Sequence, residues 1–264
     1  MQTATAPDGL AIQYLRQGGG PRMLLLQGLG ATAAAWTVNV VQLARRFICL
    51  VPDQRGVGAT GAPPGPYSTT QMALDAAAIL DAEGAAHVVG LSMGGAVAQE
   101  LALARPELVR SLTLVSSFAR ADPRAIALTR AWPDLYEAAG PELFFRQAYA
   151  WLFSPKFFER PGNLETAITY ALRDRPTLEG LRGQCAAVIG HDSSARLGEI
   201  MAPTLVMHGV RDLLTPIESA RALAAGIPGA QLHEIAGGYH ALNLECQAQF
   251  NRVVIAHAER AASE

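Results

Sequence analysis

Cysteine is scarce in this chain. Its 264 residues include three cysteines, Cys49, Cys185 and Cys246, which are far apart, odd in number and without a C-x-x-C pair. Neither a disulfide framework nor a cysteine-based metal site is expected from such a set. We therefore expect no metal, no other cofactor and a reducing, cytoplasmic location.

Long apolar runs and a surplus of one charge are also missing. No run reaches the roughly 18 apolar residues of a membrane span, and residues 1–9 lack the charged and apolar regions of a secretion signal. The net charge is −2, without a basic run or an acidic tail. We expect neither a membrane nor a nucleic acid as partner. The expected partner is a small-molecule substrate, with the protein a monomer or homodimer.

What the chain does have is an alternation of strand-like and helix-like segments. Strands are predicted at residues 23–27, 47–51, 87–90, 112–115, 204–208 and 231–235. Residues 23–27 form a continuous apolar run, typical of a strand covered on both faces. Helices are predicted over residues 32–45, 68–82, 93–105, 216–225 and 242–260. A hairpin strand is predicted over residues 10–15, with its turn at residues 18–20. The alternation predicts an α/β fold with a doubly wound, mostly parallel sheet.

The alternation is interrupted once, between residues 119 and 195. This segment has helical patterns, no predicted strand and ten of the seventeen aromatic residues of the chain. We therefore predict a core formed by residues 1–118 and 196–264. Residues 119–195 are predicted to form an inserted helical lid.

Ser92 lies in the most informative stretch, Gly90-Leu91-Ser92-Met93-Gly94. This G-x-S-x-G pattern follows an apolar strand and precedes a helix of small residues. Glycines at both flanks permit the close backbone approach of a sharp strand-to-helix turn, which exposes the serine hydroxyl. The pattern predicts a nucleophile elbow.

A serine nucleophile needs a base, and the base needs an orienting acid. His240 follows Gly237-Gly238-Tyr239, just after the last predicted strand, where catalytic groups of such sheets are found. The other downstream histidines lie in predicted strands, in the lid or near the end of the last helix. Asp212 follows the strand at residues 204–208 and completes the order serine, acid, histidine. We predict Ser92 as nucleophile, His240 as base and Asp212 as orienting acid.

An oxyanion formed during attack needs two backbone donors. The N–H of Met93, at the start of the elbow helix, is one candidate. The second is expected in the loop after residues 23–27, where Gly28 and Gly30 flank Leu29. We predict the N–H groups of Met93 and Leu29 as the oxyanion hole.

Together these features resemble the α/β-hydrolase superfamily, in its lid-bearing group of bacterial serine hydrolases. The resemblance is carried, in the family's order, by the segments 28–30, 53–58, 90–95, 209–212 and 239–245. It implies a hydrolase in which the 53–58 segment is a structural turn. This chain departs from the family in two places. Gln27 stands where a histidine usually precedes the glycine, and Tyr239 stands where a glycine usually precedes the catalytic histidine.

The expected reaction is cleavage of an ester-type bond of a small, largely apolar substrate through an acyl-enzyme on Ser92. We predict that Phe144, Phe145, Trp151 and Phe153 of the lid contribute to substrate binding. The two departures from the family pattern, Gln27 and Tyr239, are predicted to contribute as well.

Two alternatives stay open. A carbon–carbon bond hydrolase or an enol-lactone hydrolase would use the same three residues. More distantly, Gly28-Leu29-Gly30 and Asp53, 25 residues after Gly28, match the spacing of a nicotinamide-dinucleotide site. That oxidoreductase reading leaves Ser92, Asp212 and His240 unexplained.

Overall fold

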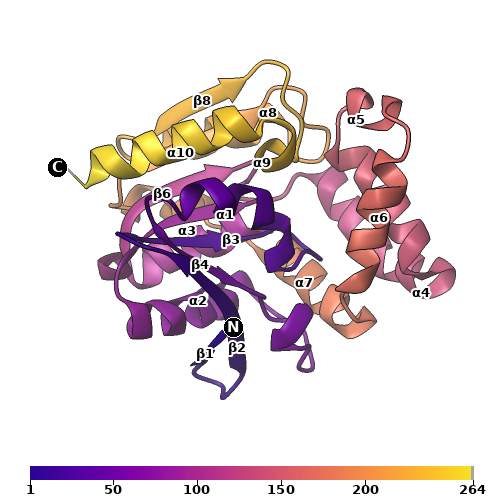
Figure 1. Ribbon diagram of the computed structural model, residues 1–264, viewed down its shortest axis with the longest axis horizontal. Coiled ribbons are helices and arrows are strands. Elements are labelled where there is room, and N and C mark those ends of the chain that lie inside the picture. Colours follow the sequence, from indigo (N-terminus) through magenta and orange to yellow (C-terminus); the bar gives the residue numbers. More distant parts are fainter. Residues whose placement is uncertain (263–264) are drawn as a thin grey trace.

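The computed structural model describes residues 1–262. Eight strands form one sheet in the order β1-β2-β4-β3-β5-β6-β7-β8 (Figure 1). Its strands are β1 Gln2–Thr5, β2 Ala11–Gly18, β3 Arg22–Leu26, β4 Ile48–Pro52, β5 Ala86–Leu91, β6 Val109–Val115, β7 Thr204–Gly209 and β8 Gln231–Ile235. The β1–β2 and β2–β4 pairs are antiparallel, and all the other pairs are parallel. The predicted fold class, a mostly parallel doubly wound sheet, is confirmed.

Helices cover both faces of this sheet. The helices of residues 1–262 are α1 Thr37–Leu43, α2 Thr69–Glu83, α3 Met93–Ala104, α4 Pro123–Leu152, α5 Pro155–Glu159, α6 Asn163–Arg173, α7 Leu178–Gly190, α8 Ile217–Gly226, α9 Leu242–Glu245 and α10 Gln247–Ala261, of which α4 to α7 belong to an insertion. Side chains alternate along β3: Leu24 and Leu26 pack with α2 and α3, whereas Met23 and Leu25 pack with α1 and α10. This two-sided burial explains why the strands are apolar throughout.

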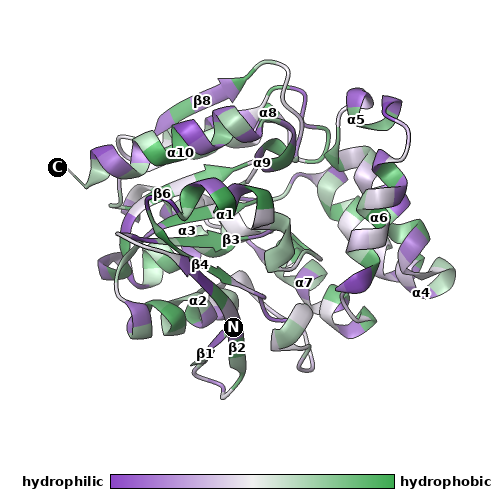
Figure 2. Cartoon of the chain, viewed as in Figure 1, coloured by the Kyte–Doolittle hydropathy of each residue, from purple (hydrophilic) through white to green (hydrophobic). Residues whose placement is uncertain are grey.

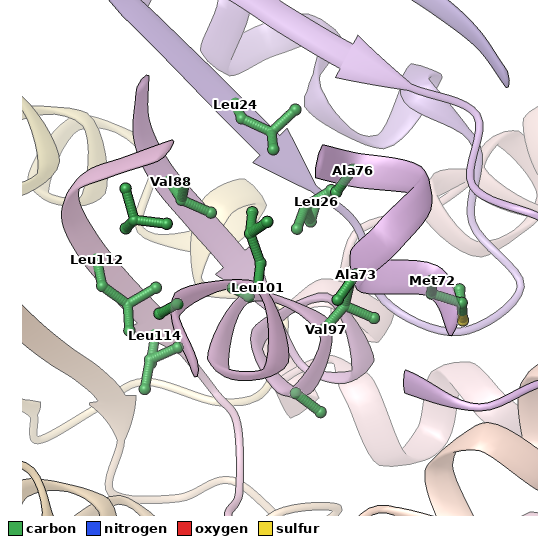
Figure 3. Packing of buried hydrophobic residues seen from close by; sticks show 14 of the residues in the cluster. Leu24, Leu26, Met72, Ala73, Ala76, Val88, Val97, Leu101, Leu112 and Leu114 are labelled. Atoms are coloured by element: carbon green, nitrogen blue, oxygen red, sulfur yellow. The ribbon is translucent and has the colours of Figure 1, made fainter. Parts of the chain in front are cut away.

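Helix α3, which follows β5, packs closely on the sheet. Figure 3 shows Val97 and Leu101, one helical turn apart, among Val88, Leu112 and Leu114 of the sheet. Alanines at the α2–α3 contact, such as Ala73 and Ala76 (Figure 3), let the two helices approach each other. The start of α3 is thereby fixed against the middle of the sheet.

Three details differ from the sequence prediction. The hairpin partner of β2 is β1, and the turn lies at Asp8 and Gly9, where the Asp8 carboxylate accepts the Leu10 N–H at 3.2 Å. The glycines at 18–20 instead carry the chain past residues 44–47: a Cβ on Gly18 would lie 2.2 Å from the Phe47 carbonyl oxygen. The helix predicted over residues 32–45 is a 3-10 turn, Ala33–Trp36, followed by the short α1. The helix predicted over residues 242–260 is divided at Cys246 into α9 and α10.

Helices α4 to α7 form the insertion between β6 and β7, and α4, α5 and α6 lie beyond one edge of the core in Figure 1. The insertion has a small core of its own, in which Trp132 and Tyr136 meet Phe144 edge to face. Its two ends lie together, because the Ser193 N–H donates to the Ala119 carbonyl at 2.9 Å.

Gln99, on α3, forms hydrogen bonds to both ends of the insertion. Its buried amide donates to the carbonyls of Gly95 and Phe118 and accepts the Ser193 hydroxyl at 2.7 Å. The insertion is therefore attached at one place to the helix that begins after Ser92.

Polar and apolar residues are interleaved along the surface helices, as Figure 2 shows for α10 and α6. Within residues 1–262, none of the helices is both long and apolar enough to span a membrane.

Candidate active site

Ser92 lies at the turn between β5 and α3. Its backbone is in the left-handed region, with φ 56° and ψ −119°, a conformation that costs a non-glycine residue about 1–3 kcal/mol. Flanking glycines make the turn possible: a Cβ on Gly90 would lie 2.3 Å from the Gly94 carbonyl oxygen, and one on Gly94 would lie 2.2 Å from the Leu26 carbonyl oxygen. The residue is 9% exposed, and its hydroxyl has no hydrogen-bond partner within residues 1–262.

Asp212 and His240 form a buried pair. His240 Nδ1 lies 2.7 Å from Asp212 Oδ2, while Asp212 Oδ1 accepts the N–H groups of Leu214 and Thr215 at 2.9 Å each. Burial alone would raise the pKa of Asp212, but the charge and hydrogen bond of His240, with smaller contributions from His208 and Thr215, keep it below its usual value. The aspartate therefore stays ionised and fixes the imidazole through Nδ1, which leaves Nε2 as the free ring nitrogen.

The Thr215 hydroxyl contacts both residues of this pair, a role that is not evident from the sequence. The hydroxyl lies 3.0 Å from Asp212 Oδ2, 2.9 Å from His240 Nδ1 and 3.1 Å from the Ser116 carbonyl oxygen. Behind it, His208 Nε2 lies 2.8 Å from the Thr215 carbonyl oxygen and 3.5 Å from Asp212 Oδ2. Burial lowers the pKa of His208, so it is a neutral donor to this carbonyl.

The end of β6 joins the serine to the histidine. The Ser92 N–H donates to the Val115 carbonyl at 2.9 Å, and the Ser117 hydroxyl donates to the Ser92 carbonyl at 2.9 Å. Between them, the Ser116 hydroxyl donates to the His240 carbonyl at 2.9 Å. Three consecutive residues therefore fix the backbone of both predicted reactive groups at one edge of the sheet.

The predicted oxyanion donors face the same edge. Gly28 lies against the serine, because a Cβ on it would be 3.4 Å from Ser92 Cβ. The Leu29 N–H makes no hydrogen bond within residues 1–262. Met93 is the first residue of α3, where an N–H has no partner within its helix. Two backbone donors are thus unpaired beside Ser92, although their role as an oxyanion hole stays a prediction.

Gln184, on α7 of the insertion, holds the loop of residues 28–30 in place. This residue is not identified in the sequence analysis. It is 0% exposed; its Oε1 accepts the Gly30 N–H at 2.7 Å, and its Nε2 donates to the Arg55 carbonyl at 2.8 Å. Gly30 is separated from Gln184 by 154 positions in the chain. No local pattern reveals such a contact.

The side chains of Gln27 and Asp53 both form hydrogen bonds to backbone groups of neighbouring segments. The buried Gln27 amide donates to the Pro52 carbonyl at 2.7 Å, so the side chain braces the end of β4; its predicted contact with substrate stays a prediction. The Asp53 carboxylate accepts the N–H groups of Ala33 and Ala59 at 2.8 Å each. Asp53 is buried and holds the backbone of residues 33 and 59, which fits the structural turn implied by the family resemblance better than a ribose-binding carboxylate.

The predicted substrate-binding aromatics have three different surroundings. Phe144 and Phe145 belong to the core of the insertion, which packs against Leu29 and Leu214 on the two loops beside Ser92. Phe153 and Tyr239 instead line a separate cavity next to Asp212. Trp151 is half-buried and stacks with Arg124, whose guanidinium carbon lies 5.9 Å from its ring centre. The cluster that holds Phe144 and Phe145 thus packs against Leu29 and Leu214, and Phe153 is joined to Phe145 through the ring of Tyr149. The contribution of these aromatic residues to substrate binding stays a prediction.

Known proteins resemble this chain over most of its length. The sequence model of the family described as alpha/beta hydrolase fold matches residues 21–246. A protein of Azorhizobium caulinodans named "Putative carbamate hydrolase RutD" is 34% identical over 247 residues, which cover 92% of this chain and 93% of that protein.

Solved structures show the same architecture. The enol-lactonase from Burkholderia xenovorans LB400 superposes with a TM-score of 0.88 at 26% identity, covering 97% of this chain and 99% of that one. A thermophilic esterase from Thermogutta terrifontis also superposes with a TM-score of 0.88 at 26% identity, covering 99% of both chains.

Proposed function

The chain belongs to the alpha/beta hydrolase fold family and is a hydrolase, and from this premise we propose that it cleaves an ester-type bond through an acyl-enzyme on Ser92. The observation that carries the proposal is the buried His240–Asp212 pair at 2.7 Å, tied through Ser116 and Ser117 to the backbone of Ser92. The imidazole is held in one orientation by an ionised carboxylate, which is what a general base beside a serine requires.

In the first half of the reaction, His240 Nε2 takes the proton of the Ser92 hydroxyl as its oxygen attacks the carbonyl carbon. The N–H groups of Leu29 and Met93 stabilise the negative charge on the carbonyl oxygen. When the tetrahedral species collapses, the bond to the leaving oxygen breaks and His240 returns the proton to it. The acyl group stays on Ser92.

In the second half, His240 removes a proton from water as the water oxygen attacks the acyl-enzyme. The product acid leaves, and the proton returns to Ser92. Asp212 stays ionised throughout and stabilises the protonated imidazole. Thr215 supports the same carboxylate oxygen that faces His240 Nδ1.

The substrate is a small, largely apolar ester. Support comes from the core of the insertion, where Phe144 and Phe145 lie in the cluster that contacts Leu29, beside Gly28, and Leu214, near Asp212 in the chain. A second candidate is an enol-lactone, a cyclic ester. The support is the enol-lactonase of Burkholderia xenovorans LB400, whose structure superposes on 97% of this chain with a TM-score of 0.88. Carbon–carbon bond hydrolysis stays an alternative that uses the same three residues.

Labelling with a fluorophosphonate tests the nucleophile. We expect the wild-type protein to gain one covalent adduct on Ser92 and the Ser92→Ala protein to gain none. The matched control is Ser111→Ala, which changes a buried serine on β6 that bonds to His87. Full hydrolysis of p-nitrophenyl esters by Ser92→Ala would contradict the proposal.

A panel of neutral and charged esters tests the substrate class. We expect kcat/KM to rise with apolar acyl length up to the capacity of the site, and to be lower for esters with charged acyl groups. Faster hydrolysis of the charged esters would contradict the apolar assignment while leaving the Ser92 chemistry intact.

A further inference from the structure

A cavity of about 690 Å³ opens between the insertion and the loop that carries Asp212. Ser92 and His240 are not among the residues that line it. Its volume falls in the range of sites for small molecules, about 300–1,000 Å³. Its wall includes Phe153 and Phe158 from the insertion and Val210, Leu213 and Tyr239 from the core.

The apolar wall is left open to solvent at several places. Phe158 is 39% exposed, Val210 is 39% exposed and Leu213 is 45% exposed. Three large apolar side chains at the mouth of one hollow form a surface that an apolar group would cover. The body of the expected ligand is therefore aromatic or aliphatic.

One positive charge also lines the cavity. Arg211 is exposed, and its guanidinium takes part in no ion pair within residues 1–262. The one acidic residue in the wall, Asp212, cannot neutralise it, because its carboxylate is fully buried and bonded to His240 and Thr215. A guanidinium without a partner is suited to bidentate binding of a carboxylate.

Both sides of the cavity are held by hydrogen bonds. On the insertion side, the Leu152 carbonyl accepts the Ala241 N–H at 3.1 Å, and Ser154 bonds through its N–H and hydroxyl to the Glu245 carboxylate. On the core side, the Arg211 N–H donates to the Gly238 carbonyl at 2.9 Å. The hollow is therefore formed before any ligand arrives, which reduces the ordering that binding requires.

We propose that this cavity binds a small monocarboxylate with an aromatic or aliphatic body, its carboxylate on Arg211 and its body against Phe153, Phe158 and Leu213. A single cation matches one negative charge, which favours a carboxylate over a doubly charged phosphate ester. The site goes beyond the proposed function, because its wall includes neither the nucleophile nor the base. Its ligand nevertheless lies against the loops of Asp212 and Tyr239, so it is placed to act on the neighbouring active site.

Binding of phenylacetate to the full-length Ser92→Ala protein, measured by calorimetry, tests the proposal without turnover. We expect saturable binding that weakens as salt is raised, because the charge pair is exposed. Arg211→Gln should raise Kd about tenfold, the effect of losing one charge-assisted contact. The matched control Arg130→Gln changes an exposed arginine of α4 outside the cavity and should leave Kd unchanged.

A second variant locates the site. Ala150 is exposed on α4 and lines the cavity, so Ala150→Phe fills the space while keeping Arg211. We expect this variant to raise Kd at least tenfold and the neutral phenylacetamide to bind far more weakly than phenylacetate. Equal Kd values for Arg211→Gln and its parent, or unchanged binding in Ala150→Phe, would overturn the proposal. Neither result depends on whether Ser92 hydrolyses esters.

Discussion

Replacement of Gln184 tests whether the insertion holds the oxyanion loop in place. The Gln184→Met change leaves the Gly30 N–H and the Arg55 carbonyl without the partners they have at 2.7 and 2.8 Å. Each buried backbone group that loses its partner costs about 1–3 kcal/mol, so the loss in unfolding free energy is about 2–6 kcal/mol. This is a large part of the about 5–15 kcal/mol typical of a domain.

Activity should fall for a separate reason. We expect the freed Gly30 N–H to turn toward another acceptor and to move the adjacent Leu29 N–H, the proposed oxyanion donor, with it. Complete loss of an oxyanion donor lowers kcat about 10²–10³-fold, so a misplaced donor should lower it about tenfold or more. KM should change little, because the donor acts mainly on the transition state.

The assay compares Gln184→Met, which keeps the volume of the side chain, with Tyr136→Phe. Tyr136 donates its hydroxyl to the Pro176 carbonyl within the insertion, and its side chain makes no hydrogen bond to residues 28–30. Both variants should unfold at lower urea concentration, whereas only Gln184→Met should lose kcat for p-nitrophenyl acetate. Equal kcat values for the two variants would refute the role assigned to Gln184.

Three further outcomes are expected. Thr215→Val keeps the shape of the side chain but removes the hydroxyl beside Asp212, and it should lower kcat for p-nitrophenyl esters several-fold; an unchanged kcat would contradict the Thr215 assignment. Ser92→Gly should abolish ester hydrolysis yet raise the unfolding free energy in urea by about 1–3 kcal/mol, because glycine adopts φ 56° without strain; equal stability of Ser92→Gly and Ser92→Ala would argue against a strained turn. Burial lowers the pKa of His87 from its usual value of about 6.5 to about 4, so the unfolded chain binds the proton first and stability in urea should fall as the pH drops from 6.5 toward 4. His87→Gln should flatten this slope, and an unchanged slope would exclude His87 as its source.

Much of the fold could be predicted because the relevant signals are local. Strands buried on both faces must be apolar throughout, and the glycines around Ser92 are required by carbonyl oxygens 2.2–2.3 Å from where a Cβ would stand. Asp212 and His240 could be found because catalytic groups follow strand ends in such sheets. The hairpin was misassigned because glycines at 18–20 look like a turn, whereas they allow close passage of the chain past residues 44–47.

The residues that hold the site together could not be predicted. Ser116, Ser117 and Thr215 are ordinary polar residues in the sequence, and their importance comes from reaching Ser92 and His240 across the sheet edge. Gln184 contacts a loop 154 positions away. Such contacts depend on the packing of the insertion on the core, which no short-range pattern encodes.

The common attachment point of the insertion has a consequence for how enzymes of this design can diversify. Because Ala119 and Ser193 meet, and Gln99 bonds to both Phe118 and Ser193, the core does not depend on the length of the chain between these two ends. A different insertion could be exchanged at this junction without disturbing the sheet. It would, however, remove Gln184, so an exchanged insertion must bring its own partner for the Gly30 N–H. Under the roles proposed for Phe144, Phe145 and Gln184, substrate choice and catalytic competence would therefore be inherited together in a single transferable segment.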